Sequence, residues 1–256
     1  MSERLYMTLH PQAVTSIQAR LNSTRLPGKV LAPVMGRPLL WYLVKRLRHA
    51  GSPLVVATSD NPADDPIAEA AGLIPVYVTR GSADDPPARH LKVARNFGAD
   101  IVAFLGADQV LVDPEHVTLA ISRLAKGDCD YVRVVGLPHG LHVWAITRRA
   151  LEECVADPSR DADEIEHTGA YWDRRPERYR TVDLDMGMAS DYRLTVDTPE
   201  DLEVHRLILE ALWPVKPMFT THDLITLLDA HPDWAKLNAH VSQYYWRGAP
   251  REGVKV

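Results

Sequence analysis

The sequence is poor in the features that mark several large classes of protein. It has only 2 cysteines in 256 residues, too few for a disulfide-rich secreted scaffold. Cys129 and Cys154 are also too far apart for a metal-knuckle spacing. No apolar run approaches the roughly 20 residues needed to span a bilayer, and the N-terminus lacks the layout of a secretory signal. We therefore expect a cytoplasmic protein that does not bind a membrane.

Positive charge is not in excess either. Lys and Arg number 29 and Asp and Glu number 34, which gives a formal net charge of −5. This balance argues against a protein that binds nucleic acid over its whole surface. It leaves room for a small basic pocket that holds a phosphorylated ligand. The 11 histidines show no zinc-binding spacing such as H-E-x-x-H.

Short β-branched runs alternate with helical patterns over the first half of the chain. Strands are expected at 13–18, 54–58, 75–79 and 101–105, and helices at 39–50, 65–71, 87–97 and 114–125. This alternation predicts an α/β three-layer fold with a mixed, mostly parallel sheet and right-handed crossovers. In such sheets the ligand lies outside the carboxyl ends of the strands, so the residues that follow each strand matter most.

The second half has a different pattern. Strands are expected at 131–135, 142–146, 181–184 and 191–196, and helices at 147–155, 164–172, 199–212 and 221–230, with Thr147 and Thr198 as helix caps. We predict one domain over residues 1–212 with a β-rich insertion at about 128–190. Residues 213–256 form a helical extension, in which the aromatic run 244–246 is expected to pack or to contact a second subunit.

A loop with three cations follows the first strand, from Gln18 to Lys29. Arg20, Arg25 and Lys29 alternate there with small polar residues, and such a loop can cradle a triphosphate through charge, forked arginine donors and backbone N–H groups. The loop is not a Walker motif, because G-x-x-x-x-G-K-[ST] is absent. The alternative is an ordinary solvated basic loop.

Two aspartates follow predicted strands. Asp108 comes after the strand at 101–105, and Asp197 after the strand at 191–196. Carboxylates brought to one sheet edge can share Mg²⁺, which prefers oxygen ligands and keeps substrate phosphates in its coordination sphere. A metal ion and cations together suit nucleotidyl transfer. The alternative is that each aspartate only ends a turn or caps a helix.

The segment QARLNSTRLPGKVL at 18–31 resembles the opening motif of cytidylyltransferases of the spore-coat polysaccharide type. These are relatives of 3-deoxy-manno-octulosonate and acylneuraminate cytidylyltransferases. The resemblance continues at 56–60, 80–85, 108–114, 166–168 and 190–202. It implies a nucleotide-diphospho-sugar transferase-like fold, a homodimer, and transfer of CMP from CTP to a small-molecule acceptor with release of pyrophosphate.

The resemblance also assigns roles to residues. Arg20, Arg25 and Lys29 would hold the triphosphate, and Asp108 and Asp197 would bind Mg²⁺. With Arg20, Lys29, Asp108 and Asp197 as the catalytic set, the nucleotide site would further include Gln18, Ala19, Asn22, Ser23, Arg25, Thr58, Ser59, Asp60, Arg80, Gly81, Ser82 and Asp84.

The acceptor half departs from the family pattern. Relatives usually have acidic residues where this chain has Pro138-His139-Gly140-Leu141-His142-Val143-Trp144, and a Cys-Pro pair where it has Gln109-Val110. We therefore expect an acceptor that is a sugar, a sugar acid or a molecule bearing a phosphate or phosphonate. The candidate residues are Arg133, His139, His142, Glu166 and His167, since protonated imidazoles donate to anions. The alternative is that the histidines only pack.

Three other functions remain open at this point. The enzyme could use another nucleoside triphosphate. It could be a nucleotide-sugar glycosyltransferase, although Asp108-Gln109-Val110 lacks the second Asp of an Asp-x-Asp motif. It could also bind nucleotides without catalysis, although such a module has no need of a metal pair.

Overall fold

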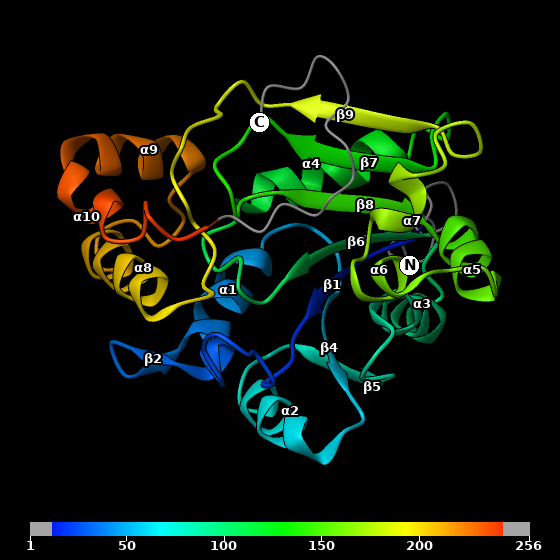
Figure 1. Ribbon diagram of the computed structural model, residues 1–256, viewed down its shortest axis with the longest axis horizontal. Coiled ribbons are helices and arrows are strands. Elements are labelled where there is room, and N and C mark those ends of the chain that lie inside the picture. Colours follow the sequence, from blue (N-terminus) through cyan, green and yellow to red (C-terminus); the bar gives the residue numbers. More distant parts are fainter. Residues whose placement is uncertain (1–11, 243–256) are drawn as a thin grey trace, which may run out of the picture.

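The computed structural model describes residues 12–242, in which seven strands form one sheet in the order β5-β4-β1-β6-β8-β7-β9 (Figure 1). The strand bounds are β1 (Ala13–Gln18), β4 (Leu54–Ser59), β5 (Tyr77–Gly81), β6 (Ile101–Gly106), β7 (Tyr131–Val135), β8 (Val143–Thr147) and β9 (Thr181–Asp185). Only β8 runs against its neighbours β6 and β7; the other pairs in this sheet are parallel. The predicted α/β class with a mixed, mostly parallel sheet is confirmed.

Successive side chains of the strands enter two separate cores, one on each face of the sheet. In β4, for example, Val56 joins one core, and Val55 and Ala57 join the other. The first core is covered by α1 (Leu39–Leu47), α2 (Asp65–Gly72), α4 (Pro114–Leu124), α8 (Pro199–Leu212) and α9 (Thr221–Ala230). The second is covered by α3 (Pro86–Phe97), α5 (Arg148–Ala156) and α7 (Ala170–Asp173). These are the three predicted layers.

The two threonine caps act as predicted. Thr147 Oγ1 accepts a hydrogen bond from Ala150 N at 3.3 Å, and α5 begins there. Thr198 Oγ1 accepts from Asp201 N at 3.3 Å, while the Asp201 carboxylate accepts from Thr198 N at 3.0 Å. This reciprocal pair satisfies N–H groups that the first turn of a helix leaves without partners.

Three predicted elements are wrong in part. Residues 191–196 form no strand, because their backbone groups bond to three separate segments; the only bridge in this stretch joins His139 and Arg193. The helix expected at 164–172 is two short helices, α6 (Ala162–Glu166) and α7, separated at Gly169, whose φ of 121° is not helical. The strand expected at 75–79 lies two residues later as β5, an edge strand with Tyr77 exposed.

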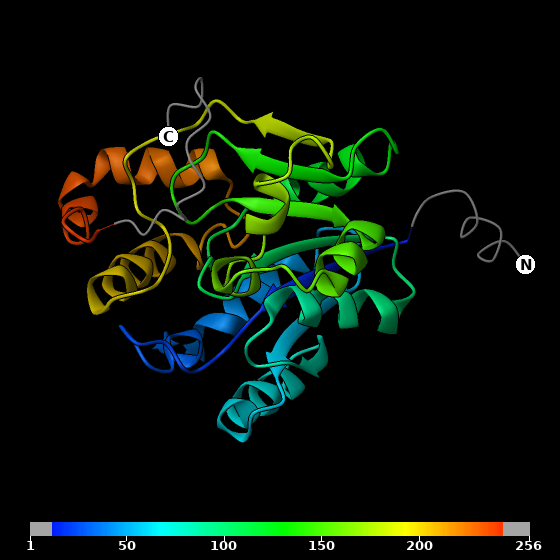
Figure 2. The same ribbon diagram turned by 45° about the vertical axis from the view of Figure 1, so that its right-hand side comes forward.

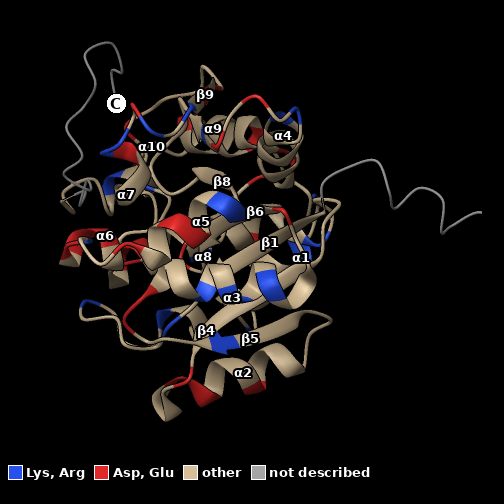
Figure 3. Cartoon of the chain, turned by 90° about the vertical axis from the view of Figure 1, so that its right-hand side faces the viewer, with Lys and Arg blue, Asp and Glu red and all other residues tan. Residues whose placement is uncertain are grey.

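Helices α8, α9 and α10 (Pro232–Lys236) group beyond the ends to which β7 and β9 point (Figures 1 and 2). Residues 128–190 contribute β7, β8 and β9 to the same sheet. The aromatic run 244–246 lies outside the described residues. Within residues 12–242, each helix is too short or too polar to cross a lipid bilayer. On the side seen in Figure 3, α3 carries basic segments, and α2 and α6 carry acidic segments.

Candidate active site

The loops after β4, β1 and β6 begin side by side at one edge of the sheet. Gln18, at the end of β1, pairs with Ala57 of β4 and with Gly106 of β6. Because these strands are parallel and in register, their carboxyl ends meet at this edge. The structure therefore brings together the loop of three cations and the residues that follow β6.

Lys29 is held near this edge by the turn that precedes it. Gly28 has a φ of 74°, which glycine adopts at little cost, and its N–H donates to Leu21 O at 3.0 Å. The Lys29 ammonium lies 2.6 Å from Asp108 Oδ2 and 2.8 Å from Asp197 Oδ1. Although burial lowers the pKa of Lys29, the two carboxylates outweigh this effect, and the pKa is raised above its usual range.

A backbone hydrogen bond holds the two aspartates together. Val196 N donates to Asp108 O at 3.1 Å, so Asp197 lies beside Asp108 although its segment is not a strand. Glycine at position 106 leaves space for the Asp108 carboxylate in its present position, because a Cβ there would lie against it. The predicted juxtaposition of Asp108 and Asp197 is thus present in the structure.

Asp197 is surrounded by cations. Its Oδ2 lies 2.6 Å from Arg193 Nη2 and 3.1 Å from Arg25 Nη2, while its Oδ1 bonds Lys29. Burial raises the pKa of Asp197, but Lys29, Arg25 and Arg193 outweigh burial and lower it below the usual value. The carboxylate is therefore ionised at neutral pH.

The donor set of this edge fits a magnesium ion. One oxygen of Asp108 and one of Asp197 already reach the same cationic atom, Lys29 Nζ, so the two carboxylates are close enough to share a cation. Mg²⁺ is commonly held by one or two carboxylates while phosphates and waters complete its coordination. Among the described residues, no cluster of three or more His, Cys, Asp or Glu has metal-binding geometry, so substrate oxygens would have to supply the remaining ligands.

The cations and aspartates line one cleft. Of the residues predicted for the nucleotide and the metal, this cleft contains Gln18, Arg20, Asn22, Ser23, Arg25, Lys29, Asp108 and Asp197. A neighbouring hollow shares Arg20 and Asn22 with it and adds Ser59, Asn61, Asp64 and Asp84. Ala19 and Thr58 are buried beneath these hollows and do not line them.

Other predicted nucleotide residues lie behind the hollow. Arg80 donates to Ser59 O at 2.8 Å and to Asn61 O at 3.0 Å, and forms an ion pair with Asp65 at 2.6 Å. Neither the cleft nor the hollow is lined by Arg80, Asp60, Gly81 or Ser82. Arg80 instead shapes the turn after β4.

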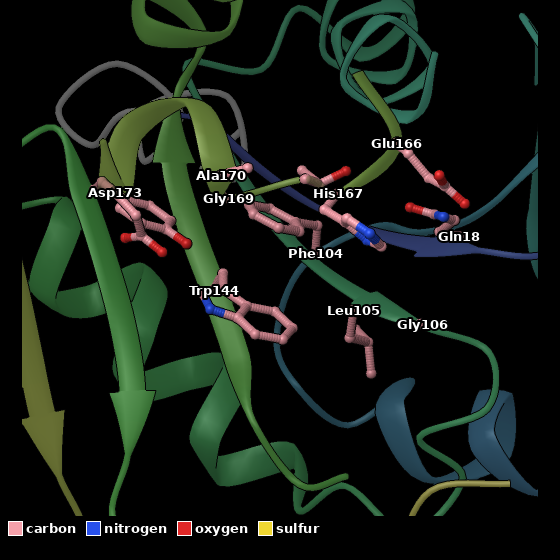
Figure 4. A pocket seen from close by; sticks show the side chains of 12 residues that line it. Gln18, Phe104, Leu105, Gly106, Trp144, Glu166, His167, Gly169, Ala170 and Asp173 are labelled. Carbon is pink, nitrogen blue, oxygen red and sulfur yellow. The ribbon is translucent and has the colours of Figure 1, made fainter. Parts of the chain in front are cut away.

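A second cavity continues from the cleft towards β8 and α7 (Figure 4). The two cavities share Gln18, Gly106, Glu166 and His167. Phe104 and Trp144 form one wall of the second cavity, with ring centroids 5.8 Å apart and planes 15° from parallel. Tyr131, fully buried, also lines it, and its hydroxyl has no hydrogen-bond partner within residues 12–242.

A family model of cytidylyltransferases matches residues 14–213. The chain belongs to the cytidylyltransferase family. It is 33% identical to the spore coat polysaccharide biosynthesis protein SpsF of Bacillus subtilis (strain 168), over 86% of this chain and 95% of that protein. It is 28% identical to a 3-deoxy-manno-octulosonate cytidylyltransferase of Methylobacterium sp. (strain 4-46), over 76% of this chain and 96% of the other. The predicted family and the predicted class, a nucleotidyltransferase, are confirmed.

Solved structures agree with this family. A cytidylyltransferase from Leptospira borgpetersenii serovar Hardjo-bovis superposes with a TM-score of 0.83 at 27% identity, covering 92% of this chain and all of that one. A CMP:2-keto-3-deoxy-manno-octonic acid synthetase complexed with CTP has a TM-score of 0.62 at 20% identity, covering 78% of this chain and all of that one. The second likeness shows the shared nucleotidyltransferase fold.

Of the residues predicted to bind the acceptor of this cytidylyltransferase, Arg133, His139 and His142 do not line the second cavity. Arg133 forms ion pairs with Asp173 at 2.9 Å and with Asp183 at 2.7 Å, so two carboxylates already neutralise its charge. Burial lowers the pKa of His142 to about 4 and also lowers that of His139. Neither imidazole is therefore charged at neutral pH, contrary to the protonated form expected from the sequence.

Several residues of this cytidylyltransferase site were not predicted from the sequence. Arg193, Asp201 and Asn238 support Asp197, and Phe104, Tyr131 and Trp144 line the second cavity. Arg193 and Asp201 lie inside the motif at 190–202, which was a usable signal. Asn238 lies beyond the family match and carried no signal in the sequence.

Proposed function

We propose that this enzyme transfers CMP from CTP to a hydroxyl group of a sugar acceptor and releases pyrophosphate, with Mg²⁺ as the metal ion. The observation that carries the proposal is the position of Lys29 between Asp108 and Asp197, at the edge where Arg20 and Arg25 line the same cleft. Positive charge beside a carboxylate pair suits a metal-bound triphosphate. The solved relative named as complexed with CTP supports the choice of nucleotide.

In the proposed reaction the acceptor oxygen attacks the α-phosphorus of CTP in line. The bond from this phosphorus to the oxygen that bridges to the β-phosphorus breaks, and pyrophosphate leaves with the bonding electrons. Arg20, Arg25 and Lys29 bind the β- and γ-phosphates and neutralise the charge that develops on them. A magnesium ion held by Asp108 and Asp197 would supply further charge neutralisation at the phosphates. His167, which lines both cavities, takes the acceptor proton.

The second cavity is the proposed acceptor site. The faces of Phe104 and Trp144 offer an apolar surface for the C–H face of a sugar ring, and Gln18 and Glu166 offer hydrogen bonds to its hydroxyl groups (Figure 4). This combination favours a sugar ring over a small phosphate or phosphonate. We propose Glu166 and His167 as the acceptor-binding residues from the set expected from the sequence.

Pyrophosphate release tests this reaction. The purified enzyme is incubated with CTP, Mg²⁺ and a panel of sugars and sugar acids, and pyrophosphate is measured. Asp108→Asn lowers the rate by about 100-fold or more, while Asp128→Asn, on the surface, leaves it unchanged. Release of CDP in place of pyrophosphate would show transfer of the γ-phosphoryl group. In a parallel incubation with nucleotide sugars, release of a nucleoside diphosphate would identify a glycosyltransferase. Either result would overturn the proposal.

We also propose a homodimer and a cytoplasmic location. The family resemblance supports the dimer, and the two free, buried cysteines are consistent with a reducing compartment. Sedimentation analysis of the purified protein tests the dimer, because a monomer and a dimer of a 28.6 kDa chain separate clearly.

A further inference from the structure

We propose that Asn238 is a positioning residue for Asp197, and that α9 and α10 bring its amide into the active-site support. The proposal rests on the proposed function, in which Asp197 holds the metal ion. Asn238 lies 25 residues beyond position 213, where the family match ends (238 minus 213). In this proposal α9, α10 and Asn238 help to position a metal-binding residue.

Asn238 is buried and makes two hydrogen bonds. Its side chain is 1% exposed, and Nδ2 donates to Asp201 Oδ1 and to Arg193 O, both at 2.9 Å. It follows α10, which packs on α8 and α9. The Asn238 amide thus holds the Asp201 side chain, at the start of α8, and the Arg193 carbonyl, in the segment that leads to Asp197.

Asp201 joins this amide to the backbone of Asp197. Its carboxylate is fully buried and accepts from Asp197 N at 2.9 Å and from Thr198 N at 3.0 Å. The same carboxylate accepts from Arg193 Nε at 2.9 Å and from Nη2 at 3.2 Å. A buried carboxylate depends on these donors, because each one compensates for lost hydration.

Arg193 joins Asp201 to the side chain of Asp197. Its guanidinium is almost completely buried, and Nη2 donates to Asp197 Oδ2 at 2.6 Å. The order of contact is therefore Asn238 to Asp201, Asp201 to Arg193, and Arg193 to the metal-binding carboxylate. Residues that hydrogen-bond a metal-binding side chain orient that side chain, and their loss commonly weakens metal binding by about 10–100-fold.

A capping role for Asp201 explains only part of this arrangement. The capping box needs Thr198 and Asp201, and it would form without Arg193 or Asn238. The amide of Asn238 adds a donor to the other oxygen of Asp201 and fixes the carbonyl of Arg193. These two bonds hold the Arg193 side chain in the orientation in which it donates to the Asp197 carboxylate.

The test is the Mg²⁺ dependence of stabilisation by CTP. The thermal midpoint of unfolding is measured at a fixed, saturating CTP concentration while Mg²⁺ is varied, and the half-effect Mg²⁺ concentration is compared between variants. Asn238→Leu keeps the approximate size of the side chain but donates no hydrogen bond; Asn238→Gln keeps the amide. Leu237→Ala alters the exposed neighbour, and Leu151→Ala lowers stability in the core on the other face of the sheet.

Asn238→Leu is expected to raise the half-effect Mg²⁺ concentration by about 10-fold, with Asn238→Gln nearer the unsubstituted protein and both controls within about 2-fold. If the leucine variant does not fold, Asn238→Ala carries the same expectation, because alanine lacks the donating NH₂ group and places no carboxyl group beside Asp201. An unchanged half-effect concentration in the donor-free variants would overturn the proposal. Failure of the unsubstituted protein to respond to CTP and Mg²⁺ would overturn the proposed function, and this inference with it.

Discussion

The ammonium group of Lys29 lies 2.8 Å from one oxygen of Asp197, and the same group binds Asp108 at 2.6 Å. A single cation therefore links a loop after β1, the loop after β6 and the segment before α8. Two neighbouring carboxylates repel each other unless a cation lies between them. In the proposed reaction cycle, Lys29 would bind the triphosphate, and Asp108 and Asp197 would hold the metal ion in place of the Lys29 ammonium.

Lys29→Met removes this shared cation and leaves Arg25 and Arg193 on Asp197. We expect the free energy of unfolding without Mg²⁺ to fall by about 2 kcal/mol, because charge-assisted hydrogen bonds to two carboxylates are lost. Addition of Mg²⁺ alone then raises the unfolding midpoint more in the variant than in the unsubstituted protein. Thermal unfolding with and without Mg²⁺ measures both effects. An equal response of the two proteins to Mg²⁺ would show that the carboxylates do not share a cation site.

Arg46→Met tests the buried contact between α1 and the segment after α8. The Arg46 guanidinium donates to the carbonyls of Pro217 and Phe219, both at 2.8 Å, and to Val112 O at 3.2 Å. Methionine fills the space but leaves buried carbonyls without donors, so we expect a loss of about 3 kcal/mol in the free energy of unfolding. Urea denaturation gives this value. A loss below about 0.5 kcal/mol would mean that these carbonyls find other partners.

Buried histidines make the protein sensitive to acid. Burial and the nearby Arg89 lower the pKa of His90 to about 3, so in the folded state it stays neutral at pH 5, whereas in the unfolded chain it binds a proton below about pH 6.5. Its contribution to stability is therefore complete above pH 6.5 and declines as the pH falls towards 3. Between pH 6.5 and 5 this costs about 2 kcal/mol.

His90→Gln removes this contribution and keeps a side chain able to bond Ser16 Oγ. The variant should lose about 2 kcal/mol less than the unsubstituted protein between pH 6.5 and pH 5, as measured by urea denaturation at the two values. Parallel pH dependence of the two proteins would show that His90 is not the group that takes up the proton.

Tyr131→Phe separates stability from acceptor binding. The Tyr131 hydroxyl is buried and has no hydrogen-bond partner in the described part of the chain. Its removal should raise the free energy of unfolding by about 1 kcal/mol, since an unsatisfied polar group is costly to bury. The same change should raise KM for the acceptor while KM for CTP is unchanged. A destabilised variant with unchanged acceptor KM would place this hydroxyl outside the acceptor site.

The sequence predicted those parts of the site that depend on local signals and parallel strands. The bounds of β1 and the cap at Thr198 follow from nearby residues. The position of Asp108 at the carboxyl edge of the sheet could be predicted because it follows a buried strand. The partners of Asp197 were not predictable, because Asn238 reaches Asp201 through packing of α10 that no local pattern encodes. Residues 191–196 read as a strand by composition, but their bonding partners come from three distant segments.

Thermal unfolding with Mg²⁺ and each of CTP, UTP, ATP and GTP is the first test of the proposed CTP-dependent reaction, because it requires no knowledge of the acceptor. A ligand at about 100 times its Kd adds roughly 2.7 kcal/mol, which is several degrees for a chain of this size. We expect CTP with Mg²⁺ to raise the midpoint by this amount and the other three nucleotides to leave it unchanged. A larger shift with another nucleotide, or no shift with any of them, would contradict the proposed reaction.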